Sequence, residues 1–334
     1  MPPSDPSKIK DLKRLLAIGA SFLRGKTVLP YFPSRLWIEV TSHCNLRCPL
    51  CPNQALSNEK KGFMDWDLYR KIVQQSAGKV HDLYLFHRGE PLLHPRLVEM
   101  IDYADHQGIP TRIHTNATLL TESLSRRLLS SRLPMISFSF DGYDQATYEQ
   151  NRPPSRFAET LAKIELFLSL KKENKNSRMI TVLQIMGLPP GSRGRALEDF
   201  TARLKSQGLD RVVYRSPHNW GGLVPLSSPP PPSAKKAGCC TFPWYALVVY
   251  WDGTVGPCPQ DFQGEMILGD MREQNLEQAW NGQRMKELRR RLALGHYDQL
   301  MACQTCDRPR RTQVAGIPLE YAKTFLKENI LGHP

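Results

Sequence analysis

Hydrophobic and polar positions follow two different periods between residues 36 and 216. Six short segments are rich in β-branched, aromatic or aliphatic residues, which is typical of β-strands. These segments are residues 36–40, 80–86, 111–114, 135–140, 180–186 and 211–215. The stretches between them place apolar residues at helical spacing, most clearly in residues 96–107 and 156–172. The pattern therefore predicts six strands and five intervening helices.

This alternation of strands and helices predicts an α/β fold built on a parallel sheet. Gly78, Gly108 and Gly208 stand where the C-terminal caps of helices belong. Six strand–helix units favour a partial (β/α)6 TIM-like barrel, although a doubly wound sheet would give the same pattern. In either arrangement, functional residues are expected in the loops that follow the strands.

The alternation stops after residue 216, and this suggests how the chain is divided. We predict a basic helical extension over residues 1–35 and a core domain over residues 36–224. Residues 225–237 include four consecutive prolines, and such a run acts as a stiff linker. A small cysteine-rich domain is expected over residues 238–310. The final segment, 311–334, is expected to hold a terminal helix over residues 319–331.

The N-terminal segment is predicted to form a basic amphipathic helix over residues 8–24. Its apolar stretch, residues 15–23, is short and has basic residues on both sides, unlike a secretory signal. Such a helix could lie on a membrane surface or pack against the body of the protein. No apolar run in the chain is long enough to cross a bilayer.

The overall charge is strongly basic, with a formal net charge of +13 over 334 residues. This balance is compatible with nucleic acid, an anionic membrane, an acidic substrate or simply a solvated basic surface. The lysines and arginines are spread along the chain, and no basic block is interleaved with aromatic residues. A nucleic-acid partner is therefore not expected.

Eight cysteines fall into two groups that are far apart in the sequence. Without an export signal we expect a cytoplasmic, reducing location, where disulfides are rare and clustered cysteines usually bind metal. The first group is Cys44, Cys48 and Cys51. The second group contains Cys239, Cys240, Cys258, Cys303 and Cys306. The two groups predict two metal sites.

The first group has the spacing C-x3-C-x2-C. Proteins usually hold a [4Fe–4S] cluster with four thiolates, so three close cysteines would leave one iron open. The alternative is a zinc site with His43 as fourth ligand, but the spacing fits the usual zinc patterns poorly.

This motif resembles that of the radical S-adenosylmethionine (SAM) superfamily, and the resemblance extends over about residues 36–310. It implies that the open iron binds SAM and that the reduced cluster cleaves it to a 5′-deoxyadenosyl radical. An electron donor such as a flavodoxin or a ferredoxin is then required. The family usually has an aromatic residue just before the third cysteine, whereas this chain has Leu50, implied to contact adenine by packing and backbone.

Further matches to the family occur after successive predicted strands. Arg88-Gly89-Glu90-Pro91 resembles the family's Gly-Gly-Glu-Pro motif, with Arg88 in place of the first glycine. The resemblance implies that Glu90 accepts hydrogen bonds from the SAM ammonium and that Arg152 pairs with its carboxylate. The other implied cofactor-binding residues are Gly89, Asn116, Ser139 and Asp141. Taken singly, each position has an ordinary alternative as a turn residue or a surface charge.

The second group supplies four thiolates, from Cys240, Cys258, Cys303 and Cys306, enough for a closed cluster or for a zinc ribbon. Residues 250–258, 268–270 and 276–280 resemble the auxiliary-cluster domain called SPASM. No cysteine follows Cys306, which resembles the shortened "twitch" form with one auxiliary [4Fe–4S] cluster. Cys240 rather than Cys239 is assigned as the ligand because it fits the family's Cys-x2-Pro-Trp pattern better.

The resemblance predicts hydrogen abstraction from a substrate C–H bond. We expect a net oxidation of a sugar, an aminocyclitol or a peptide, with the auxiliary cluster accepting an electron. Peptide maturation or group transfer is the enzymatic alternative, and a non-catalytic iron–sulfur or zinc scaffold is the alternative of another class. His87, His114, His218 and Trp220 lie near predicted strand ends and are candidates to line the pocket.

Overall fold

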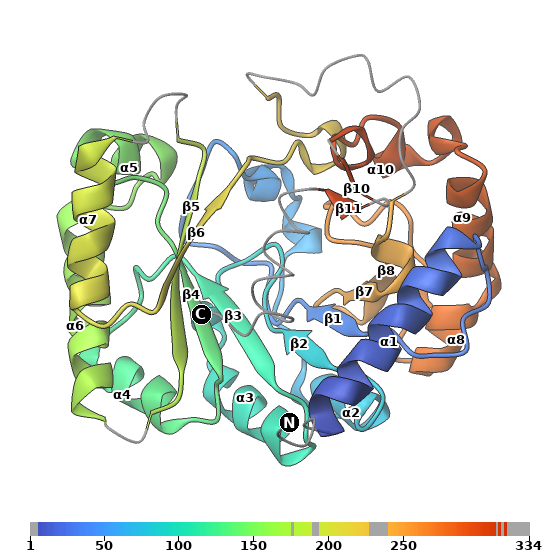
Figure 1. The fold of residues 1–334 in the computed structure, drawn as a ribbon, viewed down its shortest axis with the longest axis horizontal. Helices are drawn as coiled ribbons and strands as arrows, with labels where there is room; N and C mark the ends of the chain where they lie inside the picture. Colours follow the sequence, from blue (N-terminus) through green and yellow to red (C-terminus); the bar gives the residue numbers. More distant parts are fainter. Residues whose placement is uncertain are drawn as a thin grey trace, which may run out of the picture.

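The fold is a curved sheet with helices along its outer side (Figure 1). The computed structural model describes residues 6–174, 177–188, 194–226, 240–311, 313–314 and 317–318. Nine strands of the described chain form one sheet in the order β6-β5-β4-β3-β2-β1-β7-β8-β9, and β10 pairs with β11 separately. The strands are β1 Arg35–Ile38, β2 Asp82–Tyr84, β3 Thr111–Thr115, β4 Met135–Ser139, β5 Ile180–Met186, β6 Arg211–Arg215, β7 Ala246–Val249, β8 Thr254–Gly256, β9 Gly269–Asp270, β10 Gln313–Val314 and β11 Ile317–Pro318.

The predicted partial barrel is confirmed in its parallel part. Strands β1 to β6 pair in parallel in sequence order, and each lies within a residue or two of its predicted position. The helices are α1 Pro6–Leu23, α2 Trp66–Ser76, α3 Leu97–His106, α4 Glu122–Ser130, α5 Gln145–Asn151, α6 Phe157–Glu173, α7 Arg195–Ser206, α8 Leu276–Asn281, α9 Gln283–Ala293 and α10 Met301–Gln304.

The crossover from β4 to β5 contains two helices where the sequence predicted one. The additional helix, α5, has only seven residues, too few to show a helical repeat of apolar positions. Its first turn is fixed by Asp144, whose side chain accepts a hydrogen bond of 2.8 Å from the backbone N–H of Thr147.

The sheet does not end at the predicted domain boundary. Strand β7, from the cysteine-rich region, pairs in parallel with β1, so that Arg35 lies opposite Ala246. All four residues of β7 are buried, which an apolar strand at the centre of a sheet requires. Strands β8 and β9 then continue the sheet in antiparallel pairing. The two cysteine-bearing regions therefore share one continuous sheet.

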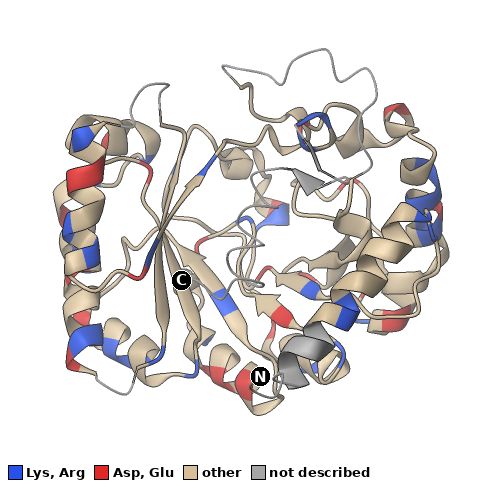
Figure 2. Cartoon of the chain, in the orientation of Figure 1, with Lys and Arg blue, Asp and Glu red and all other residues tan. Residues whose placement is uncertain are grey.

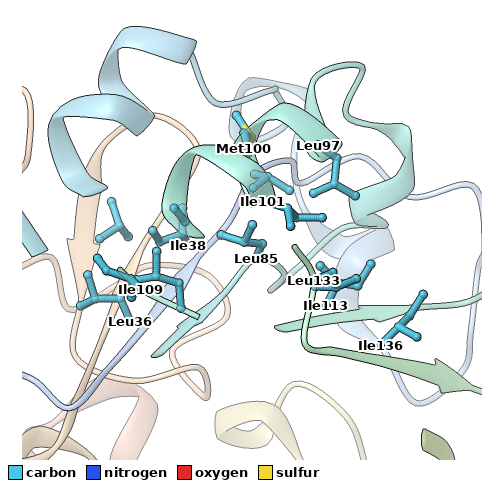
Figure 3. Close-up of a cluster of buried hydrophobic side chains, with 14 of the residues drawn as sticks. Leu36, Ile38, Leu85, Leu97, Met100, Ile101, Ile109, Ile113, Leu133 and Ile136 are labelled. Carbon is cyan, nitrogen blue, oxygen red and sulfur yellow. The ribbon is translucent and has the colours of Figure 1, made fainter. Parts of the chain in front are cut away.

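The main core lies between the sheet and the helices on its outer side. Figure 3 shows side chains from the sheet facing those of α3. The sheet contributes Leu36, Ile38, Ile113 and Ile136, and α3 contributes Leu97, Met100 and Ile101, all of them buried. Successive residues of a strand point to opposite faces. The alternate residues, including Trp37, Tyr84 and His114, therefore face the inner side of the curved sheet.

The predicted N-terminal helix is present as α1 and packs against the cysteine-rich region. Phe22 contacts Trp244 edge-to-face, with ring centroids 5.4 Å apart. The Trp244 indole N–H also donates to the carbonyl of Lys26 at 3.0 Å. Within the described residues, every helix is too short or too polar to span a membrane. Most of the predicted linker (residues 227–237) and the predicted terminal helix (residues 319–331) lie outside the described residues.

Candidate functional site

The three cysteines of the first group lie together in the loop that follows β1. Cys44, Cys48 and Cys51 are half-buried. Burial, together with a smaller effect of the neighbouring thiols, raises the pKa of the Cys44 thiol to about 11 and that of Cys51 to about 12. The structure thus brings together the three thiols that the sequence singled out. His43, the alternative fourth ligand, has its ring 4.9 Å from that of Phe63.

The surroundings of this loop suit thiolate ligands of a cationic group. The backbone N–H of Leu46 donates to the Cys44 sulfur at 3.5 Å, and the backbone N–H of Asn53 lowers the pKa of Cys51 in the same way. Buried thiols that lie close together stay protonated unless a metal compensates the charge of the thiolates. Three such thiols with amide donors fit an iron–sulfur cluster that keeps one iron open.

The loop after β2 packs tightly on this cysteine loop. A Cβ atom on Gly89 would lie 2.3 Å from the carbonyl oxygen of Thr41 and 2.5 Å from that of His43, so only glycine fits. The Asn53 side-chain amide donates to the carbonyl of Arg88 at 2.7 Å. Gly89 therefore acts here by allowing close approach of two backbone segments.

Glu90 is buried directly beside this contact. Its carboxylate accepts hydrogen bonds from the Thr115 hydroxyl at 2.6 Å, the Asn116 backbone N–H at 2.7 Å and the Leu92 backbone N–H at 3.1 Å. Burial raises the pKa of Glu90 to about 6. A carboxylate has about four acceptor positions, so one remains for another donor.

The Asn116 side chain makes contacts within the loops that surround the cysteines. Its side-chain oxygen accepts a hydrogen bond from the Thr118 backbone N–H at 3.0 Å, a typical turn contact. Its side-chain amide donates to Asn45 at 2.9 Å. The Asn116 side chain thus ties the loop after β3 to the cysteine loop, in keeping with the turn alternative.

Arg152 and Asp141, predicted as separate cofactor contacts, form an ion pair with each other. Their closest atoms are 2.5 Å apart, and both side chains are nearly buried. Burial raises the pKa of the Cys48 thiol, and the charge of Arg152 and its hydrogen bond to this thiol offset part of the rise. The Arg152 Nε is buried without a hydrogen-bond partner in the described structure. This unused donor beside the cysteine loop fits an anionic group of a bound cofactor. Ser139, the last residue of β4, is half-buried.

Leu50 is held from both sides. Its carbonyl accepts a hydrogen bond of 2.9 Å from the indole N–H of Trp220. Its side chain lies beside Gly187, where a Cβ atom would be 2.5 Å from a Leu50 methyl group. The Leu50 carbonyl is thus already engaged by the protein.

The second thiol group lines one cavity. Cys240, Cys258, Cys303 and Cys306 lie around it, together with Gln260 and Arg308. Burial raises the pKa of all four thiols, and for Cys306 the value reaches about 12. The Gln260 side-chain oxygen is buried without a partner among the described residues. Four thiols around a cavity fit a fully ligated cluster. Cys239 lies outside the described residues.

A short segment after β6 joins the two thiol regions. Besides binding Leu50, Trp220 places its ring 5.2 Å from that of Phe262. The neighbouring Asn219 donates from its side chain to the carbonyl of Thr305 at 2.7 Å, between Cys303 and Cys306 in the chain. Trp220 was predicted to line a pocket, and the structure places it between the two thiol regions.

Arg88 forms a second link that the sequence did not reveal. Its guanidinium makes two hydrogen bonds to the Glu39 carboxylate, at 2.5 and 2.7 Å, and both side chains are buried. It also lies over the Tyr250 ring at 4.3 Å and donates to the carbonyl of Phe262 at 3.3 Å. The departure from Gly-Gly-Glu-Pro therefore connects β1 with the second thiol region. The one sequence signal for this pair was Glu39, a charged residue within the otherwise apolar predicted strand 36–40.

The three candidate histidines are all held neutral. Burial lowers the pKa of His114 to about 3 and brings those of His87 and His218 well below their ordinary value. The His114 ring stacks on Phe86 at 4.1 Å, on the inner side of the sheet. His87 faces Tyr250 and Phe262, each with a centroid distance of 5.7 Å. None of the three is charged at neutral pH.

Two family models match the chain. The radical SAM superfamily model covers residues 38–212, more than half of the chain. The model of SPASM, an iron–sulfur cluster-binding domain, covers residues 239–307. The first region contains the three-cysteine loop, and the second contains the four-cysteine cavity.

The chain is also similar to characterised proteins and to solved structures. A tungsten-containing aldehyde ferredoxin oxidoreductase cofactor-modifying protein of Pyrococcus furiosus is 36% identical over 32% of the chain, but the match spans only 30% of that protein. An S-adenosyl-L-methionine-dependent 2-deoxy-scyllo-inosamine dehydrogenase of Niallia circulans is 26% identical over 82% of the chain and 92% of its own length. The structure of Streptococcus suis SuiB bound to precursor peptide SuiA has a TM-score of 0.63 and 15% identity. This similarity covers 90% of the present chain and 74% of SuiB.

Proposed function

The chain belongs to the radical SAM superfamily and carries a SPASM domain, and on this basis we propose that it removes two electrons from a substrate at a C–H bond. The observation that carries the proposal is the pair of thiol groups, one with three cysteines and one with four, in two regions that share a single sheet. The family implies a [4Fe–4S] cluster with SAM in the first domain and an auxiliary iron–sulfur centre in the second.

We assign Cys44, Cys48 and Cys51 as ligands of the SAM-binding cluster. These three residues would hold the cluster, which would supply the electron that cleaves SAM and so provide a deoxyadenosyl radical for hydrogen abstraction. Glu90 is assigned to the SAM ammonium because its carboxylate has an acceptor position left after its three internal hydrogen bonds.

Other residues would hold the remaining parts of SAM. Arg152 is assigned to its carboxylate, since the buried Nε has no protein partner in the described structure while Asp141 fixes the other side of the guanidinium. Leu50 would pack against the adenine. Ser139, at the end of β4, is assigned to the ribose or the carboxylate. Gly89 keeps the loop after β2 close to the cysteine loop.

Cys240, Cys258, Cys303 and Cys306 are assigned to a single auxiliary [4Fe–4S] cluster. Four thiols leave no iron open for the substrate, so this cluster would serve as an electron acceptor rather than as a substrate ligand. The proposed reaction is balanced as follows. The substrate carbon would give a hydrogen atom to the 5′-deoxyadenosyl radical, which becomes 5′-deoxyadenosine. A heteroatom on that carbon would release a proton to solvent, and one electron would pass to the auxiliary cluster as the C=O or C=N bond forms.

Similarity supports this reaction over its alternatives. The relative matched over 92% of its own length is a dehydrogenase, which favours a sugar or aminocyclitol substrate. The fold similarity to a peptide-bound structure keeps a peptide substrate as the second candidate. We place the reaction in the cytoplasm, with a flavodoxin or a ferredoxin as electron donor.

Anaerobic reconstitution followed by reduction in the presence of SAM tests the proposal. The protein should bind about eight irons per chain and release 5′-deoxyadenosine. With a substrate deuterated at the attacked carbon, deuterium should enter 5′-deoxyadenosine, and SAM should be consumed one for one with oxidised product. Regeneration of SAM, or a product that carries a new group without oxidation, would favour another radical SAM reaction.

A further inference from the structure

Helix α1 uses one face to pack against the protein and leaves a second apolar face exposed. On the packed side, Ser21 is buried and Phe22 contacts Trp244. On the other side, Leu12, Leu16 and Leu23 are 53, 64 and 73% exposed. We call these three leucines the α1 stripe.

The α1 stripe is a continuous line along the helix. Leu12 and Leu16 are one turn apart, and Leu23 follows three turns after Leu12, so all three project in nearly the same direction. Gly19 lies on the same face, and a side chain there would meet no other atom within 4 Å. A folded protein rarely leaves an apolar line of this kind in water unless something covers it.

Exposed basic residues stand next to both ends of the α1 stripe in the sequence, although Asp11 also precedes Leu12. Lys13, Arg24 and Lys26 are exposed next to it, and no acidic residue is present in the first turn of the helix. In Figure 1, α1 runs beside α9, and Figure 2 shows Lys and Arg residues along that neighbouring helix. The turn that follows α1 meets the end of α9, where a Cβ atom on Gly25 would lie 3.1 Å from that of Ala293. Leu294, the next residue, is also exposed.

We infer that the α1 stripe binds an anionic membrane surface, with α1 lying flat in the headgroup region. An exposed line of leucines between basic residues is the arrangement by which amphipathic helices bind such surfaces. The charge complementarity comes from Lys13, Arg24 and Lys26, and the net charge of +13 adds long-range attraction. Because α1 is packed against the cysteine-rich region, binding would orient the whole protein on the membrane. This inference is independent of the net reaction proposed above.

Sedimentation of the full-length protein with lipid vesicles tests the inference. The protein should bind phosphatidylcholine vesicles that contain phosphatidylglycerol and should bind pure phosphatidylcholine vesicles less. High salt should weaken the binding because it screens the basic residues. The variant Leu16→Ser/Leu23→Ser should lose at least about tenfold in partitioning, since each leucine contributes apolar burial. Lys13→Gln/Arg24→Gln should lose mainly the preference for anionic lipid.

A matched control is provided by Leu166→Ser on α6, which also removes an exposed leucine but lies far from α1 (Figure 1). It should bind vesicles as the wild type does. All variants should keep the wild-type iron content and release of 5′-deoxyadenosine. Failure of the wild type to bind either kind of vesicle would overturn the inference. So would equal binding by the double leucine variant. If that variant instead turns a dimer into a monomer and the wild type ignores vesicles, the stripe is an interface between two copies.

Discussion

The two thiol regions differ in what surrounds their cysteines. Cys44, Cys48 and Cys51 lie in a loop beside Glu90 and the Asp141–Arg152 ion pair, whose side chains still have hydrogen-bonding positions to offer. The four cysteines of the second region line a cavity instead, and two of them, Cys258 and Cys306, are buried. The comparison indicates that the three-thiol site can receive a charged small molecule, whereas the four-thiol site encloses a metal centre with protein ligands alone.

The largest effect is expected from removing the first thiol group. Replacing Cys44, Cys48 and Cys51 by Ala should abolish SAM cleavage, because no group then holds the reactive cluster. About half of the iron should remain in the second region. Iron analysis and chromatography of 5′-deoxyadenosine would check this. Continued deoxyadenosine formation by the triple variant would show that the two roles are assigned to the wrong regions.

Removing one thiol from the second group should have the next largest effect. Cys240→Ser should lose the auxiliary cluster while keeping SAM cleavage, because one of the four ligands is lost and the cluster becomes labile. Cys239→Ser is the matched control and should be nearly silent. Iron content and visible absorbance distinguish the two variants. The reverse result would move the ligand assignment to Cys239.

The buried Arg88–Glu39 pair links the two regions and should contribute to stability. Arg88→Met leaves the Glu39 carboxylate buried without its partner, which should destabilise the protein by about 3–5 kcal/mol. Anaerobic urea unfolding would measure this. The double variant Glu39→Leu/Arg88→Met should recover much of the loss. Arg126→Gln, which removes an exposed ion pair, should change little. Equal effects of Arg88→Met and Arg126→Gln would contradict the proposed link.

The smallest effect concerns pH. Because burial raises the pKa of Glu90 to about 6, its carboxyl should become protonated below that pH and lose the acceptor for the SAM ammonium. SAM affinity should therefore fall as the pH drops through about 6. The Glu90→Gln variant should bind SAM more weakly at neutral pH, and its affinity for SAM should not fall further as the pH drops through about 6. Calorimetric titration with SAM at several pH values would show it, and a step of equal size in Glu90→Gln would assign the titration to another group.

The raised pKa of Glu90 has the opposite effect on folding stability. The pKa of Glu90 is higher in the folded chain than the ordinary value of 4.5. The folded state therefore binds a proton more readily than the unfolded state in that range. As the pH rises from 4.5 through about 6, ionisation of the buried Glu90 carboxyl lowers the free energy of unfolding. As the pH falls through the same range, protonation of Glu90 restores that stability. The Glu90 contribution to stability thus runs against its contribution to SAM binding.

Much of the fold could be predicted from local patterns. Strands β5 and β6 have the predicted bounds, and the three cysteines follow β1 as expected. These features depend on hydrophobic periodicity and on the rule that sites in parallel sheets follow the strand ends. Strand β7 could not be predicted to join β1, because pairing between residues over 200 positions apart leaves no local pattern in either segment.

The site was predicted less completely, for a related reason. The sequence places Asp141 after a predicted strand and Arg152 further along the chain, but it does not show that they pair with each other. Arg88 could be recognised only as a departure from a motif, since its partner Glu39 follows β1, far from it in the sequence. Asn116 is engaged by Thr118 and Asn45. Which polar groups are already satisfied within the protein becomes visible only once these segments are brought together.

The central claim is that the three-thiol site is open to SAM and the four-thiol site is closed. Electron paramagnetic resonance of the reduced, reconstituted protein during titration with SAM tests it most directly. In the wild type, SAM should change the signal of one cluster and leave the second unchanged. In the variant that lacks Cys44, Cys48 and Cys51, the remaining signal should not respond to SAM. A response to SAM in that variant would contradict the account.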